Sequence, residues 1–127
     1  VLRAAHVFSE NRRCAGETAA LGAGDLERFL RLVSESGRSS WMYLQNVIPT
    51  GSAMRQELAF ALLLCERLLD GRGAFRVHGG GFAGTVQAFV PEDMLDSFRA
   101  GIDAVLGAGS CHVLSVRRAG GCLIEKM

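Results

Sequence analysis

The sequence of 127 residues lacks several features that mark common protein classes. It has no cysteines in C-x-x-C spacing, no long apolar run, and only one lysine, Lys126. It also has no large excess of charge of one sign, with fourteen basic and thirteen acidic residues. A Walker-type phosphate loop needs a lysine after its last glycine, and a membrane-spanning helix needs about 18 apolar residues, so neither is expected. The near-neutral charge gives no electrostatic footprint for nucleic acid or an anionic membrane. We therefore expect a cytoplasmic protein that binds neither.

The cysteines are few and widely spaced. None has a second cysteine or a histidine at zinc-ligand spacing, which excludes a zinc site and favours reduced, partly buried thiols over disulfides. They are Cys14, Cys65, Cys111 and Cys122. The length predicts one domain with one core. Because the chain starts with Val1, already inside a helical pattern, we expect it to be a fragment of a longer protein.

Four stretches have helical periodicity. In the first, polar residues from Arg3 to Glu17 recur every three or four positions and share one face, which predicts a solvated stripe of ion pairs. The second begins at the N-cap Asp25 and ends at Gly37. The third, from Ala53 to Leu69, is apolar on most sides and is predicted to be central to the core. The fourth begins at Pro91 and ends at Gly107.

Four further segments have strand patterns. They are Ala74–His78, Thr85–Val90, Cys111–Val116 and Cys122–Glu125. In the first, the period of two places Arg76 and His78 on one face of the strand, opposite Phe75 and Val77. The order of elements predicts an α+β fold, in which helices cover an antiparallel four-stranded sheet.

Glycine is concentrated between the first two predicted strands. Gly79, Gly81 and Gly84 satisfy the spacing G-x-G-x-x-G, but a dinucleotide site requires a helix next, and the strand pattern of Thr85–Val90 follows instead. The segment is therefore predicted to be a glycine loop between antiparallel strands. Because glycine tolerates positive φ and lets a backbone approach closely, both a structural turn and a ligand-facing loop remain open.

The glycine segment resembles the third signature motif of galactokinases, A-R-M-T-G-G-G-F-G-G-C, in the GHMP small-molecule kinase family. The matching residues are Arg76, Gly79, Gly80, Gly81, Phe82 and Gly84, and the differing ones are Val77, His78, Ala83 and Thr85. Two earlier segments are also similar, in family order. Arg3-Ala4-Ala5-His6-Val7 with Glu10 and Arg13 resembles the family's R-A-x-H-V-x-x-E-x-x-R helix, and Gly24-Asp25-Leu26 through Arg38-Ser39 resembles the helix and S-x-R-S segment after it.

The segment Ser39–Ser52 departs from the family pattern. Gly37 stands where the family's histidine would be, and Trp41-Met42-Tyr43-Leu44-Gln45 replaces an acidic stretch. The sugar preference is therefore not implied by the resemblance.

The resemblance implies that residues 1–127 are the ferredoxin-like C-terminal domain of a kinase that phosphorylates galactose or a related sugar at the anomeric hydroxyl. ATP and Mg²⁺ would be bound by the full-length enzyme. The sugar-recognition, ATP-loop and catalytic motifs of the family's N-terminal domain do not occur here. This chain is therefore expected to have no catalytic residue, no metal ligand and no activity alone, and its partner is the missing N-terminal domain.

The implied site is one wall of the active site, beside the ATP phosphates and the sugar. It comprises Arg76, His78, Gly79, Gly80, Gly81, Phe82, Ala83 and Gly84. Two roles remain open for Arg76, an ion pair with a neighbouring helix and a contact to phosphate. Two roles also remain open for His78, a hydrogen bond at the end of a strand and a contact to phosphate or sugar. Alternatives to the enzyme are a kinase-derived sugar sensor or interaction protein without turnover, and a GHMP kinase for another small molecule.

Overall fold

A two-stranded antiparallel hairpin lies at the centre of the fold. The computed structural model describes residues 1–52, 54–82, 84–117 and 119–120. Strand β1 (Ala74–His78) pairs with β2 (Thr85–Phe89) from Ala74 opposite Phe89 to His78 opposite Thr85. Both strands were predicted, because period-two alternation and flanking glycines are local signals.

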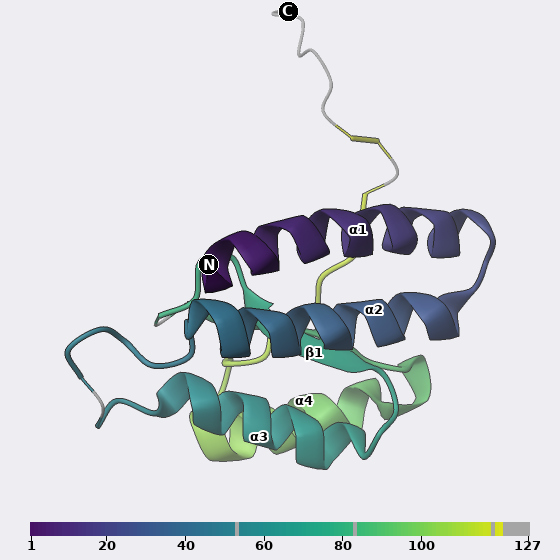
Figure 1. Cartoon of the computed structure of the whole chain (residues 1–127). Coiled ribbons are helices and arrows are strands. Elements are labelled where there is room, and N and C mark those ends of the chain that lie inside the picture. Colours follow the sequence, from purple (N-terminus) through teal and green to yellow (C-terminus); the bar gives the residue numbers. More distant parts are fainter. Residues whose placement is uncertain (53, 83, 118, 121–127) are drawn as a thin grey trace, which may run out of the picture.

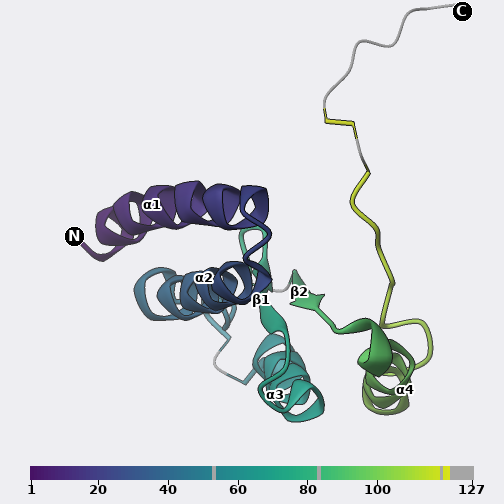
Figure 2. The ribbon, with the colours of Figure 1, turned by 90° about the vertical axis from the view of Figure 1, so that its right-hand side faces the viewer.

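Helices cover both faces of this hairpin. They are α1 (Leu2–Gly22), α2 (Leu26–Ser39), the π-helical turn η1 (Ser40–Leu44), α3 (Glu57–Leu69), the 3-10 turn η2 (Glu92–Met94) and α4 (Leu95–Leu106). Helix α2 lies against β1 on one side, and α3 lies against both strands on the other (Figures 1 and 2). Helix α1 packs on α2 as an outer layer, and α4 packs on α3.

The apolar core lies between the hairpin and the pair α3 and α4. Cys65 and Leu69 of α3 pack with Phe98 and Ile102 of α4, and Phe75 of β1 closes this cluster. A neighbouring cluster of Val47, Leu58 and Val77 extends it toward the end of the hairpin that carries the glycine loop. Each fully buried apolar side chain contributes roughly 1.5–3 kcal/mol. The prediction that α3 is central is confirmed, although the helix begins at Glu57 rather than at Ala53.

The second helix begins as predicted and ends later than predicted. The Asp25 Oδ1 accepts a hydrogen bond from the Arg28 N–H at 3.0 Å, which satisfies a free donor of the first turn. Gly37 does not end the helix, which runs to Ser39 and continues as η1. A Cβ at Gly37 would lie 2.9 Å from the Arg76 Cβ and 3.2 Å from the Phe75 carbonyl oxygen. This glycine therefore lets α2 lie directly on β1.

The predicted four-stranded ferredoxin-like sheet is wrong, because the sheet has two strands. Residues 111–117 form no strand in the described part of the chain, and Leu114 and Val116 are 88% and 95% exposed. A strand with alternating apolar residues is stable only where a neighbouring strand accepts its hydrogen bonds and a layer covers its apolar face. Where this segment continues from the end of α4, it has no neighbouring strand in the described part of the chain (Figure 1). The predicted fourth strand, Cys122–Glu125, lies outside the described residues.

Helix α1 turns its polar stripe inward. His6 is buried, and Glu10, Arg13 and Glu17 are partly buried, so the stripe lies against the rest of this domain rather than in solvent. The opposite stripe is exposed and, beside the exposed Arg12, consists of uncharged residues; we call it the outer face of α1. It consists of Ala4, Phe8, Asn11, Ala15 and Thr18. Within the described residues, no helix is long and apolar enough to cross a membrane.

Candidate functional site at the glycine loop

The connection between β1 and β2 has a left-handed backbone at three positions. Gly79, Gly81 and Phe82 have φ values of 66°, 82° and 64°. Glycine adopts this conformation without a steric penalty, whereas for a phenylalanine it is strained and costs on the order of 1–2 kcal/mol. The surrounding structure must therefore hold Phe82 in place.

Asn46 provides that hold. The Phe82 N–H donates to the Asn46 carbonyl oxygen at 2.6 Å, and the Asn46 side-chain Nδ2 donates to the Gly80 carbonyl oxygen at 3.3 Å. The same side chain accepts a hydrogen bond from the Ser40 Oγ at 3.1 Å through its Oδ1. Asn46 is 1% exposed. The inner side of the loop is thus fixed by a buried asparagine that comes from the connection before α3.

The inner side of the loop accepts no side chain at Gly81. A Cβ there would lie 2.8 Å from the Asn46 Cβ and would also overlap the Asn46 carbonyl oxygen. The outer side is open, because no atom lies within 4 Å of a Cβ added at Gly79 or Gly80, and both residues are exposed. The loop therefore has one fixed face and one free face.

Large apolar side chains are exposed beside the loop. A surface hollow of about 370 Å³ is lined by Trp41, Met42, Gln45, Val47 and Ile48. Trp41 is 58% exposed, and Phe82 on the loop is 40% exposed. Large apolar side chains that gather at the surface mark sites of interaction. This end of the domain also holds the beginning of α1 (Figure 1).

Arg76 lies behind the loop in a polar network. Its Nη1 is 3.1 Å from the Glu10 Oε1 and also donates to the Ser36 Oγ, while its Nε donates to the Val77 carbonyl oxygen at 3.1 Å. The ion pair with a neighbouring helix, one of the two roles left open by the sequence, is thus confirmed. The network joins α1, α2 and β1 on the face of the hairpin opposite the apolar core.

Glu10 is the anion of this network. Its Oε2 accepts from the Arg13 Nε at 2.8 Å, and its Oε1 accepts from Ser36. Burial raises the pKa of Glu10, but the hydrogen bonds from Ser36, Arg13 and Arg76 outweigh it, so the pKa lies below the ordinary 4.5. A carboxylate that is saturated with donors and fully ionised is a poor general base, so Glu10 has a structural role.

Glu17, two helical turns further along the same face, has the opposite shift. Burial raises its pKa, and the charge of Glu10 raises it further, against the weaker attraction of Arg76 and Arg13. Two carboxylates therefore share one group of arginines, and of these two carboxylates Glu10 is the one that Arg13 and Arg76 pair with.

A second buried bond joins α1 to the end of α2. The His6 Nδ1 lies 3.0 Å from the Ser39 Oγ, and both residues are buried. Ser36 and Ser39 thus each meet one residue of α1, and Ser36 also meets Arg76. The three segments that carry the family resemblance are linked through these side chains.

The remaining predicted site residues lie on or beside the free face. His78 is exposed at the end of β1, opposite Thr85, and Gly84 is exposed on the approach to β2. Ala83 lies outside the described residues. The structure adds Asn46 and Ser40, which the sequence analysis missed. A buried asparagine 34 residues before the loop gives no local signal, because its partners are main-chain groups.

Candidate ligands for a metal are not brought together. In residues 1–52, 54–82, 84–117 and 119–120, no three His, Cys, Asp or Glu side chains are placed to hold an ion. Cys14, Cys65 and Cys111 are free thiols, and burial, with a small effect of nearby Cys111, raises the pKa of Cys65 to about 11. Such a thiol is protonated and unreactive at neutral pH. The loop itself offers backbone N–H groups and no group that transfers protons.

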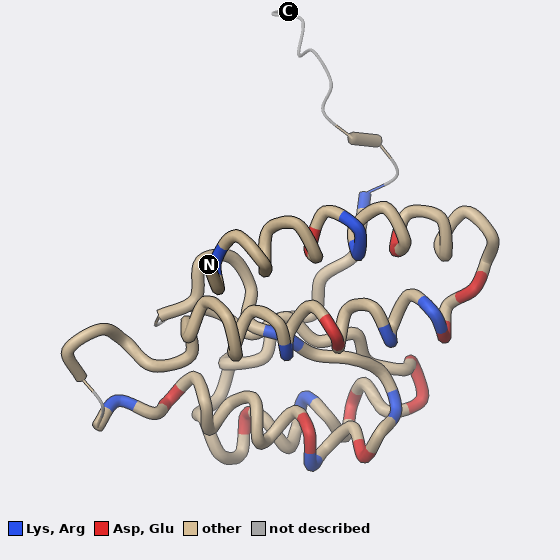
Figure 3. The backbone as a smooth tube through the Cα atoms, in the orientation of Figure 1, with Lys and Arg blue, Asp and Glu red and all other residues tan. Residues whose placement is uncertain are grey.

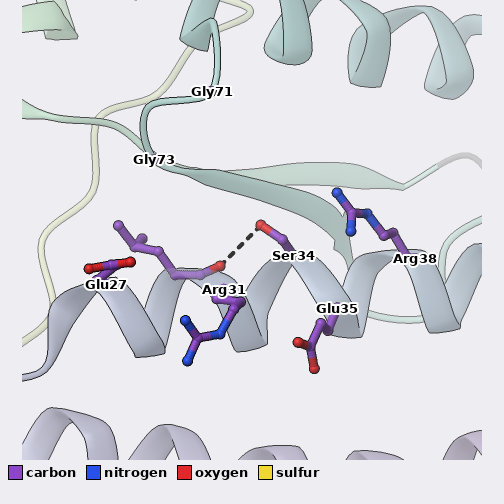
Figure 4. Close-up of a pocket in the computed structure, with 8 residues that line it drawn as sticks. Glu27, Arg31, Ser34, Glu35, Arg38, Gly71 and Gly73 are labelled. Carbon is purple, nitrogen blue, oxygen red and sulfur yellow. Dashed lines mark hydrogen bonds between the residues drawn. The ribbon is translucent and has the colours of Figure 1, made fainter.

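A second hollow, of about 410 Å³, lies between α2 and the turn before β1. It is lined by Glu27, Leu30, Arg31, Ser34, Glu35, Arg38, Gly71 and Gly73. In Figure 4 the charged ends of Arg31 and Glu35 point away from the glycine turn, and the Ser34 hydroxyl donates to the Leu30 carbonyl oxygen at 3.0 Å. Its polar groups do not converge on a common point. The glycine loop is therefore the better candidate.

Charges of both signs are interleaved along α1, α2 and α3 (Figure 3). No single-sign surface marks a polyanionic partner. Neither a protein-family model nor a solved structure matches this chain.

Proposed function

We propose that this chain is the C-terminal domain of a galactokinase-like enzyme and that its glycine loop forms one wall of the active site. The observation that carries the proposal is the two-sided loop: Asn46 holds its inner side, and Gly79 and Gly80 leave its outer side open. The strained φ of Phe82 supports a functional loop, because a plain hairpin turn has no need of a strained non-glycine residue.

The contacts among the three segments that resemble galactokinase motifs also support the proposal. Glu10 belongs to the first segment, Ser36 to the second and Arg76 to the third, and hydrogen bonds join them. Residues that resemble a family motif and also meet in space are better support than the motif alone. The network places Arg76 so that it stiffens the strand that leads into the loop.

The reaction would be transfer of the ATP γ-phosphate to the anomeric hydroxyl of galactose or a related sugar, in the cytoplasm. ATP and Mg²⁺ supply the phosphoryl group and neutralise its charge, and catalysis of this kind is mostly positioning and electrostatic stabilisation. The loop's part would be to present backbone N–H dipoles close to anionic groups, without proton transfer. Arg76 is held by Glu10, so we assign it no phosphate contact.

The partner of this domain would be the N-terminal half of the same protein. Two exposed surfaces support this assignment. The outer face of α1 consists of uncharged residues beside Arg12 and includes Phe8, which is 68% exposed, and the loop end exposes Trp41, Met42, Ile48 and Phe82. A half that carries the ATP loop would cover the loop end when the cleft forms.

The experiment that tests the proposal is substitution of Gly80 by valine in the full-length protein. Gly80 has open space around its Cβ position, so the variant should keep its melting temperature while its sugar phosphorylation falls by at least about tenfold. Gly22→Val is the matched control, because its Cβ position is also open and lies far along α1. Gly81→Val, which would overlap Asn46, should instead lose stability.

The outcomes separate the alternatives. Full activity of Gly80→Val would show that the loop is only a turn. Binding of a sugar by the full-length protein without phosphate transfer across a panel of hexoses would favour the sensor. Phosphorylation of sugars by this 127-residue chain alone would contradict the assignment of the catalytic groups to another domain.

A further inference from the structure

Asn46 is a fully buried polar residue whose hydrogen bonds converge on one side of the glycine loop. Gln45, immediately before it, has a φ of 56°. This left-handed residue ends η1 and turns the chain so that Asn46 lies under the loop while Trp41 and Met42 remain at the surface. The strained backbone of Gln45 indicates that the fold requires Asn46 to lie at this position.

The two bonds from Asn46 bracket one short piece of backbone. The side-chain Nδ2 binds the Gly80 carbonyl oxygen, and the main-chain carbonyl oxygen binds the Phe82 N–H. Together they fix the peptide planes on both sides of Gly81. In a trans peptide the carbonyl and the N–H point in opposite directions, so the inward Gly80 carbonyl directs the Gly81 N–H toward the free face, while the Phe82 N–H points inward to Asn46.

Ser40 fixes the orientation of the Asn46 amide. Its hydroxyl donates to Oδ1, which leaves Nδ2 as the only side-chain group that faces Gly80. Ser40 is itself 1% exposed and lies in the first turn of η1. The bond between Ser40 and Asn46 is therefore buried, and it directs Nδ2 toward the carbonyl oxygen of the exposed Gly80.

We propose that Asn46 is a positioning residue of the site: it sets the direction of the Gly81 N–H toward an anionic ligand on the free face, and Ser40 orients it. This inference rests on the proposed function of the loop, since a loop with no ligand needs no fixed N–H direction. Asn46 touches no ligand itself and acts through the loop backbone.

The sharpest variant is Asn46→Asp. It keeps the shape of the side chain and the acceptor for Ser40, but it replaces the Nδ2 donor by a carboxylate oxygen against the Gly80 carbonyl. Asn11→Asp is the matched control, because it makes the same chemical change on the exposed outer face of α1. Ser40→Ala is a milder variant, which keeps Nδ2 and removes only the group that orients it.

The first measurement is the ¹H–¹⁵N NMR spectrum of this whole chain. In Asn46→Asp we expect shifts and loss of rigidity at the amides of Gly79 to Phe82, with α3 and α4 unchanged. In Ser40→Ala we expect smaller changes at the same amides, and in Asn11→Asp none there. If Asn46→Asp does not fold, Ser40→Ala decides. Unchanged loop amides in a folded variant would overturn the proposal.

The second measurement is steady-state kinetics of the full-length protein. Asn46→Asp should lower kcat by at least about tenfold and change the KM for the sugar less than threefold, because a misdirected loop loses interactions made in the transition state. A normal kcat with displaced loop amides would overturn the positioning role. If the wild-type protein phosphorylates no sugar, the proposed function fails, and the NMR arm still decides whether Asn46 sets the loop.

Discussion

The carboxylate of Glu10 accepts hydrogen bonds from side chains of three elements, and this makes it the residue on which the polar face of the domain depends. Its neighbours are Arg13 on α1, Ser36 on α2 and Arg76 on β1. The side chains of Glu10 and Arg13 are only 20% and 13% exposed. Solvent therefore screens this network less than it screens the surface ion pairs.

Replacing Glu10 by glutamine should destabilise the fold by about 2 kcal/mol, because two partly buried arginines lose their counter-ion. Urea unfolding of the 127-residue chain at neutral pH measures this change. Glu57→Gln is the matched control, since Glu57 pairs with Arg55 at 3.3 Å where both side chains are well exposed. We expect less than about 0.5 kcal/mol for the control. Equal losses in the two variants would contradict the structural role of Glu10.

The stabilities of the wild-type chain and of Glu10→Gln should depend differently on pH. The pKa of Glu10 in the folded state lies below 4.5, so the unfolded chain takes up this proton first. The stability that Glu10 contributes is therefore present above about pH 4.5 and is lost as pH falls through the lower, folded pKa. The gap between wild type and Glu10→Gln should narrow as pH falls below 4.5, as measured by urea midpoints from pH 7 to pH 3.

Glu17 should show the opposite sign. Its folded pKa is raised, first by burial and then by Glu10, so ionised Glu17 is a cost to the folded state at neutral pH. Glu17→Gln is expected to stabilise the chain at pH 7, by less than about 1 kcal/mol. The difference in stability between wild type and Glu17→Gln should vanish below pH 4.5, where Glu17 is protonated and therefore uncharged like the glutamine that replaces it. A destabilised Glu17→Gln at pH 7 would show that the Glu17 charge is favourably paired.

At the residue scale, the sequence predicted the site only in part. The glycine loop and the face of β1 that carries Arg76 followed from local spacing, whereas an ion pair and a phosphate contact both stayed open for Arg76. That the partner is Glu10, 66 positions away, depends on how α1 packs against the hairpin. Asn46 and Ser40 were missed for the same reason: their partners are distant backbone groups or residues that only the fold brings together.

At the scale of elements, α1 shows why amphipathic periodicity alone does not give orientation. The polar stripe faces inward because α2 and β1 offer it Ser36, Ser39 and Arg76 as partners, and each bond offsets the cost of burying a polar group. A pattern of charges at steps of three and four fits a solvated stripe equally well. The hairpin was predicted correctly since its two strands are close in sequence, whereas a four-stranded sheet needed distant pairings that do not form among the described residues.

The contact between α2 and β1 gives a prediction at this scale. Gly37→Ala should destabilise the chain by about 1–3 kcal/mol, because the added Cβ would meet the Arg76 Cβ and the Phe75 carbonyl oxygen, and a strand backbone cannot easily move. In an open helix the same change would stabilise by up to about 1 kcal/mol. Gly22→Ala, with nothing within 4 Å, is the control and should be neutral or stabilising. Thermal unfolding of both variants compares the two signs.

At the scale of the whole molecule, the two sides of the hairpin serve different ends. The side of α3 and α4 holds the apolar clusters that stabilise the domain. The side of α1 and α2 holds the polar network that joins the similar segments and leads into the loop. The outer face of α1 and the apolar loop end are exposed, and α1 lies on the side of the hairpin away from α3 and α4 (Figure 2).

This arrangement predicts which residues the proposed N-terminal half of the protein would protect from amide hydrogen exchange. Amide hydrogen exchange of residues 40–48 and 78–82 should be slower in the full-length protein than in this chain alone, because the proposed partner covers the loop end and limits local opening. Exchange in α3 should be equal in the two proteins, since its buried face packs on the hairpin and α4 within the chain. Equal exchange at the loop in both would contradict the proposed cleft, because an active-site wall that is never covered cannot exclude water from phosphoryl transfer.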